Sequence, residues 1–181
     1  RVAQESGHTT SFVKFAPGSY FPQHSHPQGE EIFVLEGVFS DEQGDYPAGT
    51  YIRNPPGSFH KPFTKEGCTL FVKLEQFQND DTKHVVIRPE DQQWFQGIGN
   101  LKVLALHAHG TESTALGALT KNERFQANHN MGGEEIVGIS GRFIDEHGEY
   151  PAGTWLRSPH MSQHFPRVEE ETLIYVKVGY L

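Results

Sequence analysis

The chain has 181 residues, of which 35 % are hydrophobic, enough to bury a core in one large domain or two small ones. Lys and Arg number 15 against 23 Asp and Glu, and the formal net charge of −8 argues against nucleic acid and anionic membranes as partners. The single cysteine, Cys68, excludes an internal disulfide, and no apolar run approaches the roughly 18 residues of a membrane span. We therefore expect a cytoplasmic protein.

Both halves of the chain show the pattern of β-structure. The candidate strands are short runs rich in β-branched and aromatic residues, bounded by turn residues, at positions 11–15, 30–39, 69–74, 83–88, 101–106, 134–140 and 172–180. No long helical period competes, although a short helix or turn is expected around Arg88 to Trp94. The pattern predicts an all-β fold, either a sandwich or a barrel.

The chain also contains an internal repeat. Residues 39–50 read FSDEQGDYPAGT and residues 143–154 read FIDEHGEYPAGT, a shift of 104 positions. With this shift, residues 21–62 align without a gap to residues 125–166, at 20 identities in 42 positions. Because repeats of this kind correspond to repeated structural units, we predict two similar β-barrels in tandem.

The repeat suggests where the two barrels begin and end. Residues 1–77 form the N-terminal barrel, and the second copy covers residues 105–181. The 27 residues between them, 78–104, contain strand-like runs that we expect to open the second barrel, which would then span 78–181. By the same reasoning, roughly as many residues are expected to precede Arg1 and to carry the first strands of the N-terminal barrel.

Residue types that bind metals cluster in the first copy. His24, His26 and Glu30 have the spacing H-x-H-x3-E, so that the two histidines share one face of a strand and the turn residues 27–29 can start a neighbouring strand at Glu30. His60 can bring a fourth donor to the same place. Three imidazoles and one carboxylate suit a divalent first-row transition ion such as Fe, Mn, Ni, Cu or Zn, not Ca²⁺ or Mg²⁺.

With the glycines and prolines around them, these residues resemble the two cupin motifs, G-x5-H-x-H-x3-E-x6-G and G-x5-P-x-G-x2-H. The matching residues are Gly18, His24, His26, Glu30, Gly37, Gly49, Pro55, Gly57 and His60. Residues 30–74 further resemble the cupin domain of ChrR-type anti-sigma factors. The resemblance extends over both copies and implies a bicupin, that is, two tandem jelly-roll β-barrels.

The resemblance also implies one metal ion at His24, His26, Glu30 and His60. Zinc is the ion that it favours, with Fe, Ni or Mn as alternatives. The sequence departs from the family pattern in two places. Thr64 stands where the second motif usually has asparagine, and the chain has no His-x3-Cys-x2-Cys motif, which belongs to the helical module that grips a sigma factor.

The second copy has lost part of this donor set. The shift of 104 positions places Asn128, Asn130, Glu134 and His164 opposite His24, His26, Glu30 and His60. An amide oxygen is a weak ligand for these ions, so we expect a degenerate second site that binds them poorly or not at all. The alternative is a rebuilt site in which His160 or His129 joins Glu134 and His164.

A few other residues could carry chemistry but have simpler interpretations. Glu31 falls on the opposite face from Glu30 and is expected to be solvated or hydrogen-bonded. Arg53, in an otherwise apolar strand, needs a partner. Cys68 is expected to be a core residue, the alternative being a redox-sensing thiol, and the pair His107 and His109 is expected to be structural.

Three functions are compatible with this sequence, and no catalytic residue is assigned. The resemblance favours a regulatory protein that senses a metal, a ligand or an oxidant. The alternative is a metal-dependent dioxygenase acting on a small chelating substrate, and in a third hypothesis the metal only stabilises the barrel. The expected partners are a small-molecule ligand or a regulatory protein, together with a second copy of the chain in a homodimer.

Overall fold

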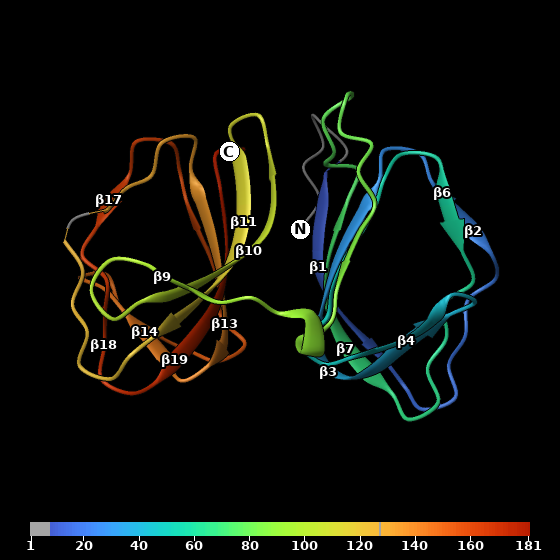
Figure 1. Cartoon of the computed structure of the whole chain (residues 1–181), viewed down its shortest axis with the longest axis horizontal. Helices are drawn as coiled ribbons and strands as arrows, with labels where there is room; N and C mark the ends of the chain where they lie inside the picture. Colours follow the sequence, from blue (N-terminus) through green and yellow to red (C-terminus); the bar gives the residue numbers. More distant parts are fainter. Residues whose placement is uncertain (1–7, 127) are drawn as a thin grey trace. The chain divides into compact units, whose positions relative to one another are not determined.

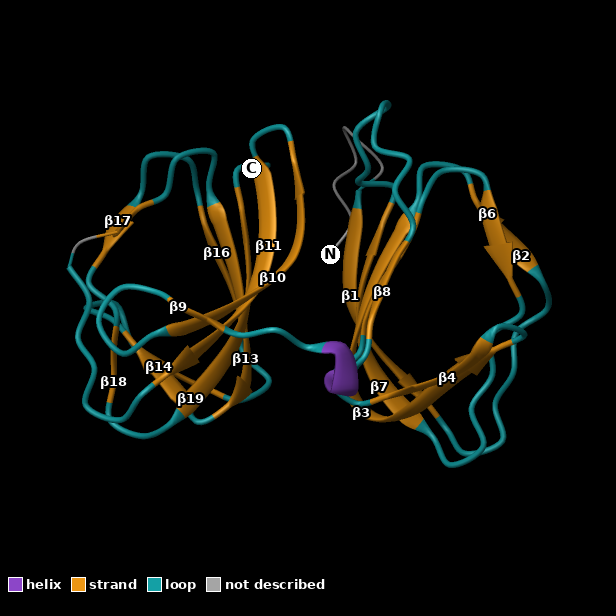
Figure 2. Ribbon diagram, in the orientation of Figure 1, coloured by secondary structure: helices purple, strands orange, loops and turns teal. Residues whose placement is uncertain are grey.

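The computed structural model describes residues 8–126 and 128–181, with the side chain of Asn128 left out. The described residues form β-strands, turns and one short 3-10 helix, so the predicted all-β class is confirmed (Figures 1 and 2). The chain divides into two compact units, Arg1–Gln92 and Gln93–Leu181, here called unit 1 and unit 2. No helix in the described part of the chain is long and apolar enough to cross a membrane.

Unit 1 is built on a large antiparallel sheet with the strand order β1-β7-β3-β5-β8. Strand β4 pairs with the C-terminal residues of β3. Strands β2 and β6 pair only with each other in a separate two-stranded sheet. The strands of unit 1 are β1 (Thr9–Phe15), β2 (His24–His26), β3 (Glu30–Asp41), β4 (Gly44–Pro47), β5 (Tyr51–Asn54), β6 (Ser58–His60), β7 (Cys68–Leu74) and β8 (Val85–Ile87).

Unit 2 repeats this plan with a sheet of order β16-β13-β19-β11-β10-β9, a three-stranded sheet β15-β14-β18 and the pair β12-β17. Its strands are β9 (Phe95–Gln96), β10 (Lys102–His109), β11 (Glu112–Leu119), β12 (Asn128–His129), β13 (Glu134–Ser140), β14 (Arg142–Ile144), β15 (Glu149–Pro151), β16 (Trp155–Ser158), β17 (Gln163–His164), β18 (Arg167–Val168) and β19 (Thr172–Val178). The 3-10 helix η1 (Pro89–Asp91) lies where the sequence predicted a short helix or turn.

The two units of the structure divide at a different place from the two copies of the repeat. Residues 78–104 do not all belong to unit 2, because β8 pairs with β5 of unit 1 while β9 and β10 join the sheet of unit 2. The structural division therefore lies between Gln92 and Gln93 and not after residue 77. The repeat could not reveal this, because β8 has no counterpart in the second copy with which to align.

Successive side chains of strand β3 point to opposite faces of the sheet, which puts Glu30 on the same face as core residues. Ile32 and Val34 pack in the core of unit 1, and Glu30, two residues earlier, shares their face. A bulge between Val34 and Glu36 then shifts the register, and β3 goes on to pair with β4. Strand β13 has the same irregularity between Gly138 and Ser140 and also begins with a glutamate, Glu134, so the bulge and the leading carboxylate both belong to the repeated plan.

Gly37 of the first cupin motif is required by the backbone. Its φ is +72°, and a Cβ at this position would collide with the carbonyl oxygen of Gly67. Gly141, its counterpart in unit 2, has a φ of +71° and would collide with the carbonyl oxygen of Glu171. The backbone therefore requires glycine at both positions. This requirement explains why the glycine is present in both copies although the metal-ligand residues differ.

Candidate metal centre

The predicted ligands come together through the two-stranded sheet β2-β6. His24 and His26 lie on β2 and His60 lies at the end of β6, directly opposite His24 in the antiparallel register. Strand β2 thus pairs with the strand that carries the fourth predicted donor, whereas Glu30 reaches the same place from the start of β3 after a turn.

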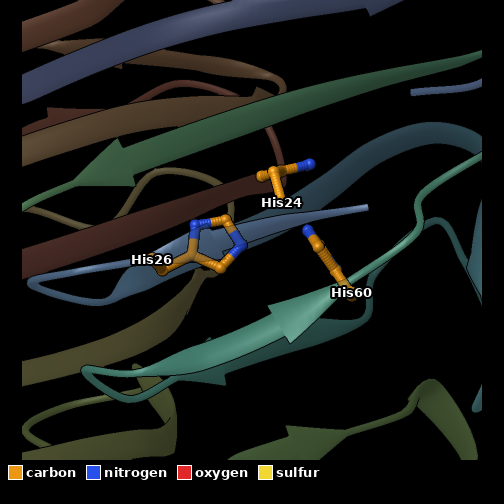
Figure 3. Close-up of side chains that lie close together, drawn as sticks. All are labelled: His24, His26 and His60. Carbon is orange, nitrogen blue, oxygen red and sulfur yellow. The ribbon is translucent and has the colours of Figure 1, made fainter. Parts of the chain in front are cut away.

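Three imidazoles converge at this point (Figure 3). The ring centroids of His24 and His26 are 4.9 Å apart, those of His24 and His60 4.9 Å, and those of His26 and His60 4.8 Å. One nitrogen of each ring lies within 4.8 Å of the nitrogens of the other two. Such a group of imidazoles offers neutral nitrogen donors to a transition metal ion.

Glu30 adds a carboxylate to the three imidazoles. Its Oε2 lies 3.3 Å from Nε2 of His26 and 3.5 Å from Nε2 of His60. Asn54, opposite Glu30 in the β3-β5 register, donates a hydrogen bond of 3.1 Å to the same oxygen. Burial raises the pKa of Glu30 even though the neighbouring histidines and Asn54 act in the opposite direction.

The residues present fit a metal ion. Nε2 of His26 and Nε2 of His60 are buried, and neither forms a hydrogen bond with any described residue. Burial and the two neighbouring imidazoles lower the pKa of His26 to about 4, so that its ring is neutral at physiological pH and available as a donor. Buried nitrogens that face a carboxylate without a hydrogen bond are satisfied when an ion lies between them.

Asp41 and Tyr46 support the site, and sequence reasoning missed them. Oδ2 of Asp41 lies 3.6 Å from Nδ1 of His60, and the hydroxyl of Tyr46 donates a hydrogen bond of 3.1 Å to Oδ1 of Asp41. Burial would lower the pKa of His60, but the contacts with Asp41 and Glu30 outweigh it and raise the pKa. Both residues recur in the repeat, as Asp145 and Tyr150, and this recurrence was the available signal.

In unit 2, the same framework holds fewer donors. His164 has its Nε2 3.2 Å from Oε2 of Glu134 and its Nδ1 3.5 Å from Oδ2 of Asp145, which repeats the arrangement around His60. Asn130 is buried and donates a hydrogen bond of 3.1 Å to the Ser162 hydroxyl. The predicted Asn128 has its side chain outside the described part of the chain. Of the imidazole and carboxylate donors that converge in unit 1, the described part of unit 2 therefore keeps the counterparts of Glu30 and His60, which are Glu134 and His164.

The histidines of the alternative rebuilt site are placed differently. His160 is exposed, and its Nδ1 accepts a hydrogen bond of 2.8 Å from the backbone N–H of Gly132. His129 is exposed as well. Within residues 8–126 and 129–181, the group of three or more metal-ligand side chains is the one formed by His24, His26 and His60.

The remaining candidates have structural roles. Arg53 finds the partners that the sequence required: its guanidinium lies 3.2 Å from Oε2 of Glu31 and 2.5 Å from Oδ2 of Asp81, all three side chains being buried. Cys68 is buried in the core of unit 1, and burial raises its pKa, which opposes a role as a reactive thiolate. His107 is buried on β10.

Comparison with known families identifies this arrangement. A family model described as the ChrR cupin-like domain matches residues 1–78 and 82–181. The chain belongs to the ChrR cupin-like family. No curated protein matches the sequence. The two segments of the match correspond to the two copies of the repeat, so the predicted ChrR-like bicupin is confirmed over nearly the whole chain.

Solved bicupin structures share the fold at low sequence identity. A candidate dioxygenase from Nostoc punctiforme matches with a TM-score of 0.84 and 15 % identity, over 98 % of this chain and 71 % of that protein. Oxalate decarboxylase from Bacillus subtilis, a protein with Mn(II) centres, matches with a TM-score of 0.68 and 14 % identity, over 96 % and 69 %. The enzyme of the same name from Lactobacillus farciminis matches with a TM-score of 0.67 and 14 % identity, over 97 % and 78 %. At these identities the likeness concerns the fold alone.

Proposed function

We propose that unit 1 holds one divalent transition metal ion through His24, His26, His60 and Glu30, and that the protein is a regulatory sensor of metal, ligand or oxidant. The observation that carries the proposal is the convergence of three imidazoles, two of which face the same carboxylate oxygen of Glu30 through buried nitrogens that have no hydrogen-bond partner among the described residues. Zinc is the ion that we expect, and Fe, Ni or Mn are the alternatives.

The site has a buried side and an open side. His26 and His60 are 5 % and 3 % exposed, whereas His24 is exposed. A bound ion would supply a Lewis-acid centre to which a small molecule can bind. Because His24 borders the solvent, a ligand can approach past this residue, and Asn54 keeps Oε2 of Glu30 directed towards the imidazoles. Membership in the ChrR cupin-like family favours the use of this site in sensing.

A second candidate function is a metal-dependent dioxygenase acting on a small chelating substrate. The likeness to a candidate dioxygenase over 98 % of this chain favours it. In this case Glu30, whose pKa is raised by burial, would take up a proton from the substrate at the carboxylate oxygen other than Oε2, while the Asp41 carboxylate would keep the His60 ring in place.

For partners, we propose a small-molecule ligand or a regulatory protein, and a second copy of the chain. The net charge of −8 gives no support to nucleic acid or an anionic membrane. Analytical ultracentrifugation tests whether the chain forms a homodimer. A monomer at micromolar concentration would contradict this proposal.

The experiment that tests the metal site is elemental analysis of the untagged protein purified without added metal. We expect about one equivalent of metal per chain, because only unit 1 has the full donor set. Two equivalents would show that unit 2 binds metal as well, and a protein without metal that also fails to take up Zn²⁺, Fe²⁺, Ni²⁺ or Mn²⁺ in a titration would refute the proposal.

Measurements on the same preparation distinguish the sensor from the dioxygenase. Under the sensor proposal the protein contains zinc, consumes no oxygen in the presence of 2,4-pentanedione or catechol, and changes its pattern of limited proteolysis when EDTA removes the ion. Iron, nickel or manganese together with oxygen uptake that depends on either compound would favour the dioxygenase.

A further inference from the structure

Unit 2 contains a cavity of about 630 Å³ that is partly open to the solvent. Its walls come from β10, β11, β13 and β19 and are mainly apolar, with Val103, Leu119, Ile136, Ile174 and Val176 among the lining residues. The volume lies within the range of natural small-molecule sites, and all lining residues belong to unit 2.

One substitution between the repeats helps to explain the space. Val13 packs against the core of unit 1, and the repeat places Gly117 at the corresponding position on β11. Gly117 lines the cavity, and a Cβ there would lie 3.3 Å from Cγ1 of Ile174. The same Cβ would lie 3.7 Å from Cδ1 of Leu101, another lining residue, so a valine at position 117 would take up space among the side chains that line the cavity.

The cavity contains a buried polar pair inherited from the metal-site framework. Glu134 and His164 both line it, at 5 % and 4 % exposed. Nε2 of His164 lies 3.2 Å from Oε2 of Glu134 but has no hydrogen bond of good geometry with any described residue. A buried polar nitrogen of this kind is stabilised by a ligand that can hydrogen-bond to it.

The surroundings of the pair indicate which polar group it accepts. Asp145 lies 3.5 Å from the other nitrogen of His164, so two carboxylates flank one imidazole and a ligand carboxylate would be repelled. A hydroxyl group suits either protonation state of the ring, because it can accept a hydrogen bond from Nε2–H or donate one to the bare nitrogen or to Glu134. Glu123 and Arg124 also line the cavity and have opposite charges, so this part of it favours neither an anionic nor a cationic ligand.

We propose that unit 2 binds a neutral, largely apolar small molecule with one hydroxyl group, such as an alkylphenol, with the hydroxyl at Glu134 and His164 and the hydrocarbon part against the apolar walls. Unit 2 is thus a ligand-binding barrel whose site arose where the metal ligands were lost. This proposal does not depend on the metal in unit 1.

The test compares three probes with the same hydrocarbon body by isothermal titration calorimetry on the full chain at pH 7. We expect 4-propylphenol to bind about tenfold to a hundredfold more tightly than propylbenzene, which offers no hydrogen bond to Nε2 of His164, and than 4-propylbenzoate, which adds a negative charge. Equal affinities for all three probes, or no binding of 4-propylphenol, would overturn the proposal.

Variants locate the site. Gly117→Val is expected to weaken 4-propylphenol binding at least about tenfold by filling the cavity, and Gly117→Ala to weaken it less. His164→Leu should abolish the preference for the phenol over propylbenzene, whereas the matched variant His60→Leu in unit 1 should keep it. Far-UV circular dichroism and thermal unfolding identify which variants are folded.

The outcomes for these variants decide the proposal. Unchanged binding in folded Gly117→Val or Gly117→Ala, or equal loss of the phenol preference in His60→Leu and His164→Leu, would place the probe elsewhere and refute the assignment. Failure of the metal proposal would appear instead as a lack of metal in the wild type, without any change in these titrations.

Discussion

Units 1 and 2 have the same framework around different interiors. Both bend the long strand at an equivalent bulge, both turn at a glycine with positive φ, and both hold a histidine between a glutamate and an aspartate. Unit 1 adds His24 and His26 to this framework, whereas unit 2 has asparagines at those positions and a cavity beside Gly117. The comparison shows that the residues that maintain the fold recur in both units, whereas the residues at the metal-ligand positions differ between them.

The largest expected difference between the units is in metal content. His24→Ala removes an exposed imidazole from the donor set, and we expect the metal to fall from about one equivalent per chain to nearly none. Asn128→Ala, at the corresponding position of the second copy, should leave the metal content unchanged. Elemental analysis of both variants measures this, and equal losses would contradict the assignment of the site to unit 1.

The second prediction concerns the buried arginine of unit 1. Arg53→Met leaves the carboxylates of Glu31 and Asp81 buried without their shared cation, so we expect a loss of about 3–5 kcal/mol in the free energy of unfolding. The matched change Arg157→Met removes a side chain that is 31 % exposed and lies 3.0 Å from Glu135, and should cost about 1.5 kcal/mol. Urea unfolding compares them, and equal costs would show that the two arginines are equivalent.

A smaller effect is expected from the carboxylate behind His60. Asp41→Asn keeps the shape of the side chain but removes the charge that orients the ring, so we expect the metal affinity to fall about tenfold to a hundredfold. Competition with a chelator of known affinity measures the change. Asp145→Asn, the matched variant in unit 2, serves as the control, and a similar loss in that variant would mean that the effect is not local to the site.

Features of the fold and of the site could be predicted where they follow from sequence motifs, and not where they depend on contacts between distant segments of the chain. The repeat and the spacing of His24, His26, Glu30 and His60 are local patterns, and they predicted the fold class and the residues that now converge. The pairing of β8 with β5 and the contact of Asp81 with Arg53 join segments that no local pattern relates. The cavity that Gly117 lines is formed by residues from several strands, so it becomes evident only when the surrounding walls are known.

The smallest predicted effect is an opposite pH dependence of two histidines, one in each unit, in metal-free protein. The pKa of His26 is lowered to about 4, so this ring binds fewer protons in the folded than in the unfolded chain, and its contribution to stability is lost as the pH falls from about 6.5 towards 4. The neighbouring Glu134 carboxylate raises the pKa of His164, so the contribution of this ring to unit 2 is complete below about 6.5 and is lost as the pH rises through the raised value.

Histidine side-chain NMR spectra recorded across this pH range measure the two titrations. The expected result is that the His26 ring titrates well below the His164 ring. Coincident midpoints for the two rings would contradict the difference between the sites.

The small size of the β2-β6 sheet has a consequence for local unfolding. Three residue pairs join these strands, and the sheet contains all three clustered imidazoles. Opening the pair would separate His60 from His24 and His26, so a bound ion opposes that opening by mass action, by about 2.7 kcal/mol at a free ion concentration one hundred times the dissociation constant. Amide hydrogen exchange of β2 and β6 should therefore slow as metal binds, which makes this sheet a reporter of metal occupancy.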